Sequence, residues 1–190
     1  KVFPYQYLAA ARYAQEYTEL LEKAMFKDLK EKEKLPGKTI LLVDKSGSMS
    51  SGVSKNGEMA AYDYAKSLAI LLKEMSDECV IYTFDTYTQL IGDYRGFDLA
   101  NQMGYADGGT YLWKSVSEVK RQNPQAERII VLTDEQTADV YNKDDINYKK
   151  QYMINLAGYE NGISYRPDWI HIDGFSQTVI DYIQEYENQF

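Results

Sequence analysis

The sequence predicts an α/β protein with a doubly wound, mostly parallel central sheet that is flanked by helices and preceded by an extra N-terminal helix. Near-continuous apolar runs at 40–43 and 129–132 are typical of strands that are covered on both faces. Between such runs lie segments whose apolar residues recur at helical spacing, as at 61–72. Because predicted strands alternate with predicted helices, we expect a parallel sheet with helical crossovers.

The segment at about 5–32 is predicted to be the N-terminal helix. One apolar helical face is expected from residues at spacings of four, three and four, namely Tyr13, Tyr17, Leu20 and Ala24. Pro36 and Gly37 end this segment, because proline cannot continue a helix and glycine permits a turn. We therefore expect a helix and linker at 1–37, packed on a single α/β domain at 38–190.

The other elements follow from the same two periodicities. Strands are predicted at 38–43, 79–84, 86–91, 129–132 and 169–172. Helices are predicted at about 58–75, from 110 to about 121, and in a closing segment that contains Val179, Tyr182, Ile183 and Tyr186.

Composition and net charge restrict the classes of function that the sequence allows. The chain has 190 residues and 44% hydrophobic content, which suits one core in one domain. Its 21 basic and 29 acidic residues give a net charge of −8, which disfavours broad binding to nucleic-acid phosphates. Cys79 is the single cysteine, and no apolar run approaches the roughly 18 residues of a membrane span. We expect a monomeric, cytoplasmic piece of a longer protein, with no signal peptide and no membrane contact.

The loop Asp44-Lys45-Ser46-Gly47-Ser48 directly follows the apolar run at 40–43. It places one carboxylate and two hydroxyls at the end of a predicted buried strand. Such oxygen ligands suit a hard cation like Mg²⁺ or Mn²⁺, and the absence of nearby cysteine or histidine argues against zinc or copper.

Two further segments extend this candidate site. Asp134 directly follows the run at 129–132, so it should emerge at the same edge of a parallel sheet as Asp44. Thr110 follows Gly108-Gly109, which permits a close approach of the backbone. Carboxylates about 5 Å apart repel by roughly 3 kcal/mol at an effective dielectric constant of about 20, and a dication between them removes this penalty. The predicted ligands, which leave a position for a partner carboxylate or phosphate oxygen, are Asp44, Ser46, Ser48, Thr110 and Asp134.

These three segments resemble the metal-ion-dependent adhesion site (MIDAS) of von Willebrand factor type A domains. The resemblance implies a mostly parallel sheet flanked by helices and a bound Mg²⁺, or else Mn²⁺ or Ca²⁺. It also implies that Ser46 and Ser48 are direct ligands and that Thr110 ligates directly or through water. Asp44 and Asp134 would act chiefly through water.

The chain is also similar, over nearly its whole length, to the Ro autoantigen (TROVE) family. The similar segments are FPYQYLAAAR at 3–12, PGKT at 36–39, TDEQT at 133–137 and DGF at 173–175. The resemblance implies that the type A domain closes a ring of HEAT-like repeats, and that the full-length protein binds small noncoding RNAs in RNA quality control. The ring carries most of the RNA contact in that family, so we expect weak or no RNA binding by this chain alone.

The same residues allow a purely structural interpretation. Asp44, Ser46 and Ser48 would then form a polar turn that caps a helix. Thr110 would be another helix cap, and Asp134 an exposed loop acid. This alternative does not explain why all three segments occur together.

The sequence also suggests roles for residues near the candidate metal site. Tyr111 and Trp113 are candidates for a rim around the metal. Glu135 is expected to be an exposed loop acid. Asp85 also follows a predicted strand, and His171 is expected to be a sheet residue rather than a catalytic base.

Two functions other than a Ro-like module are compatible with a type A domain or with the loop residues. The first is a type A domain of a chelatase-type or AAA-ATPase-associated assembly factor, which would bind an acidic protein residue through the metal. The second is catalysis, which is not expected. The chain lacks a Walker A loop, and no serine at 46–51 has glycine at both second neighbours, as a nucleophile elbow requires.

Overall fold

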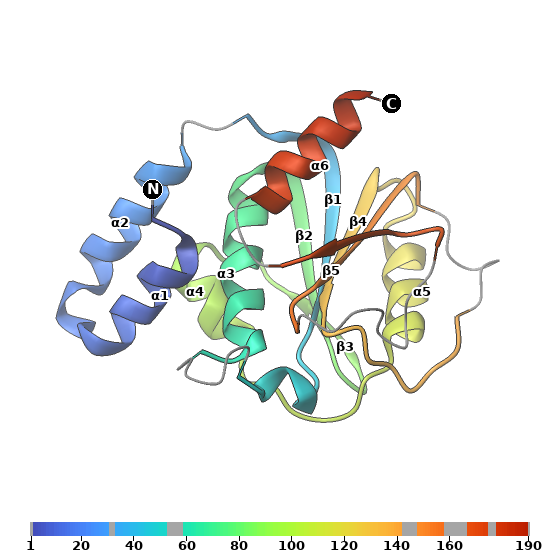
Figure 1. The fold of residues 1–190 in the computed structure, drawn as a ribbon, viewed down its shortest axis with the longest axis horizontal. Helices are drawn as coiled ribbons and strands as arrows, with labels where there is room; N and C mark the ends of the chain where they lie inside the picture. Colours follow the sequence, from blue (N-terminus) through green and yellow to red (C-terminus); the bar gives the residue numbers. More distant parts are fainter. Residues whose placement is uncertain are drawn as a thin grey trace.

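A six-stranded sheet forms the centre of the protein (Figure 1). The computed structural model describes residues 2–30, 33–52, 59–141, 148–157, 167–174 and 178–189. The strand order in these residues is β3-β2-β1-β4-β5-β6, and only the β2–β3 pair is antiparallel. The strands are β1 (Leu35–Asp44), β2 (Ser76–Phe84), β3 (Thr88–Ile91), β4 (Arg128–Thr133), β5 (Lys150–Asn155) and β6 (Ile170–Asp173). The predicted doubly wound, mostly parallel sheet is confirmed.

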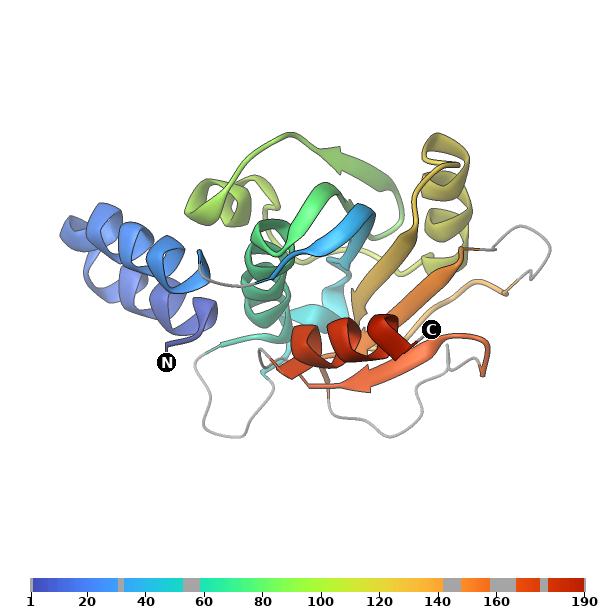
Figure 2. The same cartoon turned by 90° about the horizontal axis from the view of Figure 1, so that it is seen from above.

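Helices cover both faces of this sheet. They are α1 (Pro4–Tyr13), α2 (Thr18–Leu29), α3 (Ala61–Glu74), α4 (Gly96–Gln102), α5 (Leu112–Gln122) and α6 (Thr178–Gln189), with two short 3-10 turns, η1 (Gln15–Tyr17) and η2 (Gly47–Ser50). Figure 2 shows α5 on one side of the sheet and α3 with α6 on the other. Among the described residues, no helix has the length and apolar character needed to cross a membrane.

Side chains of the central strands alternate between two apolar cores. Leu41 and Val43 of β1 contribute to the core under α3 and α6, whereas Ile40 and Leu42 contribute to the core under α5. All four side chains are fully buried. Burial on both faces explains why β1 has a continuous apolar run instead of an alternating pattern.

The strand order also fixes the place of the candidate site. After β1 the chain adds β2 and β3 on one side, and it then returns to add β4, β5 and β6 on the other side. The switch point therefore lies between β1 and β4, and ligands of open α/β sheets bind beyond the carboxyl ends of the strands at such a point. Asp44 ends β1 and Thr133 ends β4, so the loops that follow both strands leave the sheet at this place.

The N-terminal segment differs from the prediction. Instead of one helix, α1 and α2 form a hairpin around η1, and the Tyr7 hydroxyl donates a 2.7 Å hydrogen bond to Asp28 across it. The predicted apolar face is wrong, since Tyr13 and Leu20 are 74% and 62% exposed while Met25 is buried. The 3-10 turn changes the helical phase, so a periodicity counted across it does not mark one face.

The hairpin packs on α3 and α4. The ring of Tyr5 in α1 lies 5.2 Å from the ring of Tyr64 in α3. Glu22 in α2 accepts a 2.8 Å hydrogen bond from the backbone N–H of Phe97, in the first turn of α4. Contacts with both α3 and α4 thus hold the hairpin against the helical layer.

Two elements of the structure were absent from the predictions. The strand β5 has the sequence KQYMIN, in which polar residues interrupt the apolar pattern, although the strand lies buried between β4 and β6. The helix α4 spans only seven residues, too few to show a helical period. The other predicted strands and helices occur in the expected order, with ends that differ by up to three residues.

A buried ion pair joins the amino end of the sheet to the last helix. The guanidinium of Arg128, at the start of β4, donates hydrogen bonds of 2.8 and 2.7 Å to the carboxylate of Glu187 in α6. Lys150 and Tyr152 of β5 donate to the same carboxylate at 2.8 and 3.0 Å. Burial opposes ionisation of Glu187, but the hydrogen bonds from Arg128 and Lys150 lower its pKa below the ordinary value.

We expect Glu187→Ala to destabilise the fold by about 3–5 kcal/mol, because it leaves the buried Arg128 charge without its partner. Urea unfolding followed by circular dichroism measures this loss. The matched control is Glu185→Ala on the exposed side of the same helix, which should change stability by less than about 0.5 kcal/mol. A similar small change in both variants would contradict the role assigned to the ion pair.

Candidate metal centre

Asp44 is held rigidly at the carboxyl end of β1. Its side chain is fully buried. One carboxylate oxygen accepts a 2.8 Å hydrogen bond from the backbone N–H of Ser46, and the other accepts a 2.7 Å hydrogen bond from the Thr133 hydroxyl at the end of β4. Thr133 was not among the predicted site residues, although it directly precedes Asp134. The parallel register of β1 and β4 brings it beside Asp44.

The two serines of the loop bring their hydroxyls together. The turn η2 begins at Gly47, and the Oγ atoms of Ser46 and Ser48 lie 3.2 Å apart. In an octahedral Mg²⁺ site with ligand distances of about 2.1 Å, adjacent oxygens lie about 3 Å apart. The serine pair therefore has the spacing of two neighbouring ligands of one small cation.

A close backbone contact fastens this loop to the loop before α5. The N–H of Gly47 donates a 3.0 Å hydrogen bond to the carbonyl of Gly108, and Asp107 N–H donates to the carbonyl of Lys45 at 2.8 Å. A Cβ atom at position 47 would lie 3.4 Å from the Gly108 oxygen, an ordinary contact distance, so it is the two hydrogen bonds that fix this approach. The loop that carries Thr110 is thereby held against the loop that carries the serines.

Thr110 itself is partly buried on this second loop. Its carbonyl accepts a 2.9 Å hydrogen bond from Ala138 N–H, and the next residue, Tyr111, donates its N–H to the carbonyl of Asp85 at 3.0 Å. In the described part of the chain, the Thr110 hydroxyl makes no hydrogen bond to the other four predicted ligands. Its place in the site rests on the position of its loop.

Asp134 completes the group from the end of β4. Its side chain is buried, and one carboxylate oxygen accepts a 3.1 Å hydrogen bond from the N–H of Gln136. Asp134 and Ser48 line the same cavity of about 100 Å³, together with Ser51, Gly52, Ala61, Gln136 and Ala157. The structure thus links Asp44, Ser46 and Ser48 by hydrogen bonds and places Asp134 on the wall of the same cavity as Ser48.

The electrostatics of this group favour a cation. Burial raises the pKa of Asp44 to about 7, the hydrogen bonds from Ser46 and Thr133 oppose the rise, and the negative charge of Asp134 adds to it. A dication would offset both the cost of burying the charge and the repulsion between the two carboxylates.

Within the described residues, no three His, Cys, Asp or Glu side chains are grouped to hold a metal, so this donor set depends on its hydroxyls. Two carboxylates with two or three hydroxyl oxygens fit Mg²⁺, Mn²⁺ or Ca²⁺.

Several residues near the site differ from their predictions. Glu135 is 2% exposed, so the prediction of an exposed acid is wrong. It has a φ of 58°, and its carboxylate lies 2.9 Å from Nδ1 of His171 in β6. Trp113 is buried in an aromatic group beside Trp169 and therefore does not form a rim, whereas Tyr111 is partly exposed.

Asp85 follows β2 but is already engaged. Its carboxylate accepts a 2.8 Å hydrogen bond from the N–H of Tyr87 and lies 3.4 Å from the ammonium of Lys45. Lys45 thus balances the charge of Asp85, and the carboxylates that repel one another at the centre are those of Asp44 and Asp134.

The raised pKa of Asp44 predicts a pH-dependent stability in the absence of metal. Between the ordinary value of 3.8 and about 7, folded Asp44 holds a proton that the unfolded chain releases. The contribution of Asp44 to the free energy of unfolding is therefore lost as pH rises through that range. In EDTA at pH 8, Asp44→Asn should be more stable than the wild type by about 2 kcal/mol or more, with a smaller difference at pH 5.

Urea unfolding in EDTA at the two pH values measures this difference. Asp98→Asn, a change of an exposed acid in α4, serves as the control and should not stabilise the protein at pH 8. If Asp44→Asn has the same pH dependence as the wild type, the proton is not held at Asp44.

Comparison with known proteins supports the fold. The sequence matches no family model, and no curated protein matches it. The Ro (RSR) protein of Deinococcus radiodurans aligns with a TM-score of 0.71 and 17% identity, over 95% of this chain and 43% of its own. An aerotolerance-related membrane protein of Bacteroides fragilis, solved with multiple mutations to serines, aligns with a TM-score of 0.56 and 14% identity, over 81% of this chain and 100% of its own.

These two structures share the sheet and its flanking helices with the present chain. The chain spans less than half the length of the Deinococcus Ro protein. At such low identities the likeness establishes architecture and leaves residue roles to be argued from the site itself. The chain therefore has the α/β fold that occurs in a part of the Deinococcus Ro protein and in the Bacteroides protein.

Proposed function

We propose that this domain is a binding module that depends on a divalent cation, Mg²⁺ or else Mn²⁺ or Ca²⁺, held by Asp44, Ser46, Ser48, Thr110 and Asp134. The observation that carries the proposal is the 3.2 Å separation of the two serine hydroxyls beside two buried carboxylates. When bound, the cation would supply a positive charge that attracts an anionic oxygen. Hydrogen bonds from Ser46, Thr133 and Gln136 orient the two carboxylates.

The cavity beside Ser48 and Asp134 gives that oxygen a way in. Its volume of about 100 Å³ has room for a few waters or for one carboxylate or phosphate group. Gln136 and Ser51 on its wall can donate hydrogen bonds to such a group. The protein ligands leave positions open, as a site that recognises an external oxygen requires.

Titration calorimetry with Mg²⁺ and Mn²⁺ tests the site. Wild-type protein should bind both ions, and Ser48→Ala and Asp134→Asn should each weaken binding by at least about tenfold, because each removes a ligand or its orienting partner. Ser50→Ala is the matched control in the same loop, since its hydroxyl donates to the Gly47 carbonyl at 2.6 Å instead. Unchanged affinity in Ser48→Ala and Asp134→Asn would remove these residues from the site.

We further propose that the full-length protein is a Ro-like, cytoplasmic RNA-binding protein whose partners are small noncoding RNAs. The likeness to the Deinococcus Ro protein over 95% of the chain supports this assignment. So do the sequence similarities at both ends of the chain. The net charge of −8 on this chain implies that a more basic part of the protein makes most of the phosphate contacts.

The 190-residue chain alone should therefore bind RNA poorly. In filter binding with a structured small RNA at about 0.15 M salt, we expect no saturation below about 10 μM protein, with or without Mg²⁺. Gel-shift measurements provide an independent check. Submicromolar binding would show that this domain carries an RNA site of its own.

A further inference from the structure

A second cavity lies away from the candidate metal centre, where the N-terminal hairpin meets α3 and α4. We call it the seam cavity; its volume is about 340 Å³, within the size range of small-molecule sites. Its apolar wall consists of Leu8, Ala11, Phe97 and Ala100, and its polar groups belong to Arg12, Gln15, Thr18, Asp63, Lys66 and Asn101.

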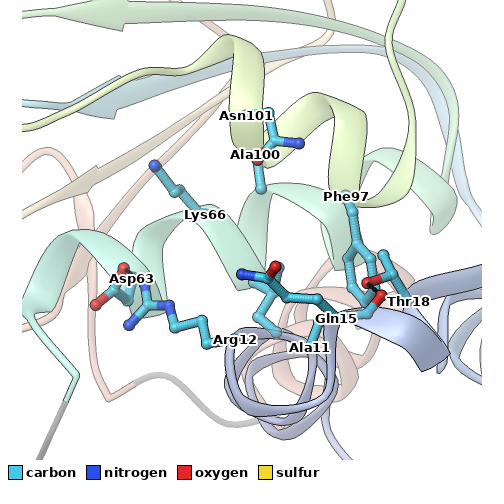
Figure 3. A pocket seen from close by; sticks show the side chains of 10 residues that line it. Ala11, Arg12, Gln15, Thr18, Asp63, Lys66, Phe97, Ala100 and Asn101 are labelled. Carbon is cyan, nitrogen blue, oxygen red and sulfur yellow. Dashed lines mark hydrogen bonds and ion pairs between the residues drawn. The ribbon is translucent and has the colours of Figure 1, made fainter.

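Figure 3 shows how the polar and apolar parts are separated. Arg12 reaches from α1 to Asp63 on α3 at one end, where the two side chains form an ion pair. Phe97 and Thr18 lie at the other end, and Gln15 lies between the two ends. A ligand in this cavity would therefore meet charge at one end and an aromatic ring at the other.

Lys66 is the feature that points to an anion. Its ammonium lies 4.8 Å from the centre of the Tyr62 ring and 5.8 Å from that of Tyr105. In the described part of the chain it makes no ion pair, because Asp63 on the same helix is paired with Arg12. Arg12 and Lys66 carry two positive charges and Asp63 carries one negative charge, so the formal charge at this end of the cavity is +1. A half-buried cation without a carboxylate partner gains from an anion placed beside it.

We propose that the seam cavity binds a small organic anion, with its carboxylate or phosphate beside Lys66 and its apolar body against Phe97 and Ala100. The Gln15 and Asn101 amides can hydrogen-bond polar atoms at the cavity mouth, where both side chains are exposed. The seam cavity shares no lining residue with the cavity at Ser48 and Asp134. The proposal is thus independent of metal binding.

Nuclear magnetic resonance titration of the whole chain tests this proposal. The probes are phenyl phosphate and phenylacetate, with inorganic phosphate and neutral benzyl alcohol for comparison. All titrations contain EDTA, so that an anion bound to metal does not contribute. We expect saturable shifts at α1, α3 and α4 with one or both aromatic anions, and binding of inorganic phosphate and benzyl alcohol at least about tenfold weaker. The choice between the two aromatic anions tells whether a carboxylate or a phosphate is preferred.

Two substitutions locate the ligand. Lys66→Met keeps the aliphatic stem and should weaken anion binding by at least about tenfold, the usual effect of losing a charge-assisted hydrogen bond. Ala11→Leu should fill the cavity and weaken binding of the same probe by a similar factor. Lys23→Met and Ala24→Leu make the same changes at exposed positions of α2 and should bind as the wild type does. Thermal unfolding of all four variants shows whether each is folded.

Three results would overturn the proposal. The first is the absence of saturable binding by either aromatic anion. The second is equal binding of inorganic phosphate or benzyl alcohol, since the charged and apolar ends would then not act together. The third is unchanged affinity in a folded Ala11→Leu variant, which would place the anion outside the seam cavity even if Lys66→Met failed to fold.

Discussion

The buried carboxylate of Asp44 is the constraint on which the candidate metal centre depends. A charge at the end of a central strand loses its hydration, and the nearby Asp134 adds repulsion. Hydrogen bonds from Ser46 and Thr133 hold the carboxylate in place but do not neutralise it. The carboxylate is therefore fixed in place, and its burial carries an electrostatic cost that the proposed cation would relieve.

Such a strained group needs a rigid support, and the sheet provides it. The strand β1 lies at the middle of the sheet with apolar cores on both faces, so its end has little freedom to relax. The strand β4 is fixed at both ends: Arg128 is paired with Glu187 at its start, and Thr133 is bonded to Asp44 at its finish. The amino end of the sheet thus carries a carboxylate paired with a guanidinium, whereas the Asp44 carboxylate at the carboxyl end has only neutral hydrogen-bond donors as partners.

The sequence allowed the sheet to be predicted, together with the position of Asp44 and Asp134 at the carboxyl ends of their strands, because both follow from local patterns. Apolar runs mark strands that are buried on both faces, and Asp44 and Asp134 directly follow such runs. The wrong predictions concern residues whose burial cannot be read from the local hydrophobic pattern. Glu135 is buried through its contact with His171, which lies 36 residues away, and no local signal indicates that pair. The hairpin was misjudged because one short turn, η1, changed the phase of a helical pattern that continued on both sides.

The first turns of α3 connect the two sites of the molecule. Ala61 lines the cavity of the metal centre, whereas Asp63 and Lys66 line the seam cavity, because successive helical positions point to different sides. Tyr62 stands between them: its ring is beside the ammonium of Lys66, while burial and the charges of Asp44 and Asp85 raise the pKa of its phenol. The Tyr62 hydroxyl donates to the Met103 carbonyl at 2.7 Å, which fixes the ring. The carboxylate of Asp44 and the ammonium of Lys66 therefore lie on different sides of one fixed aromatic ring, which separates the two cavities in the fold.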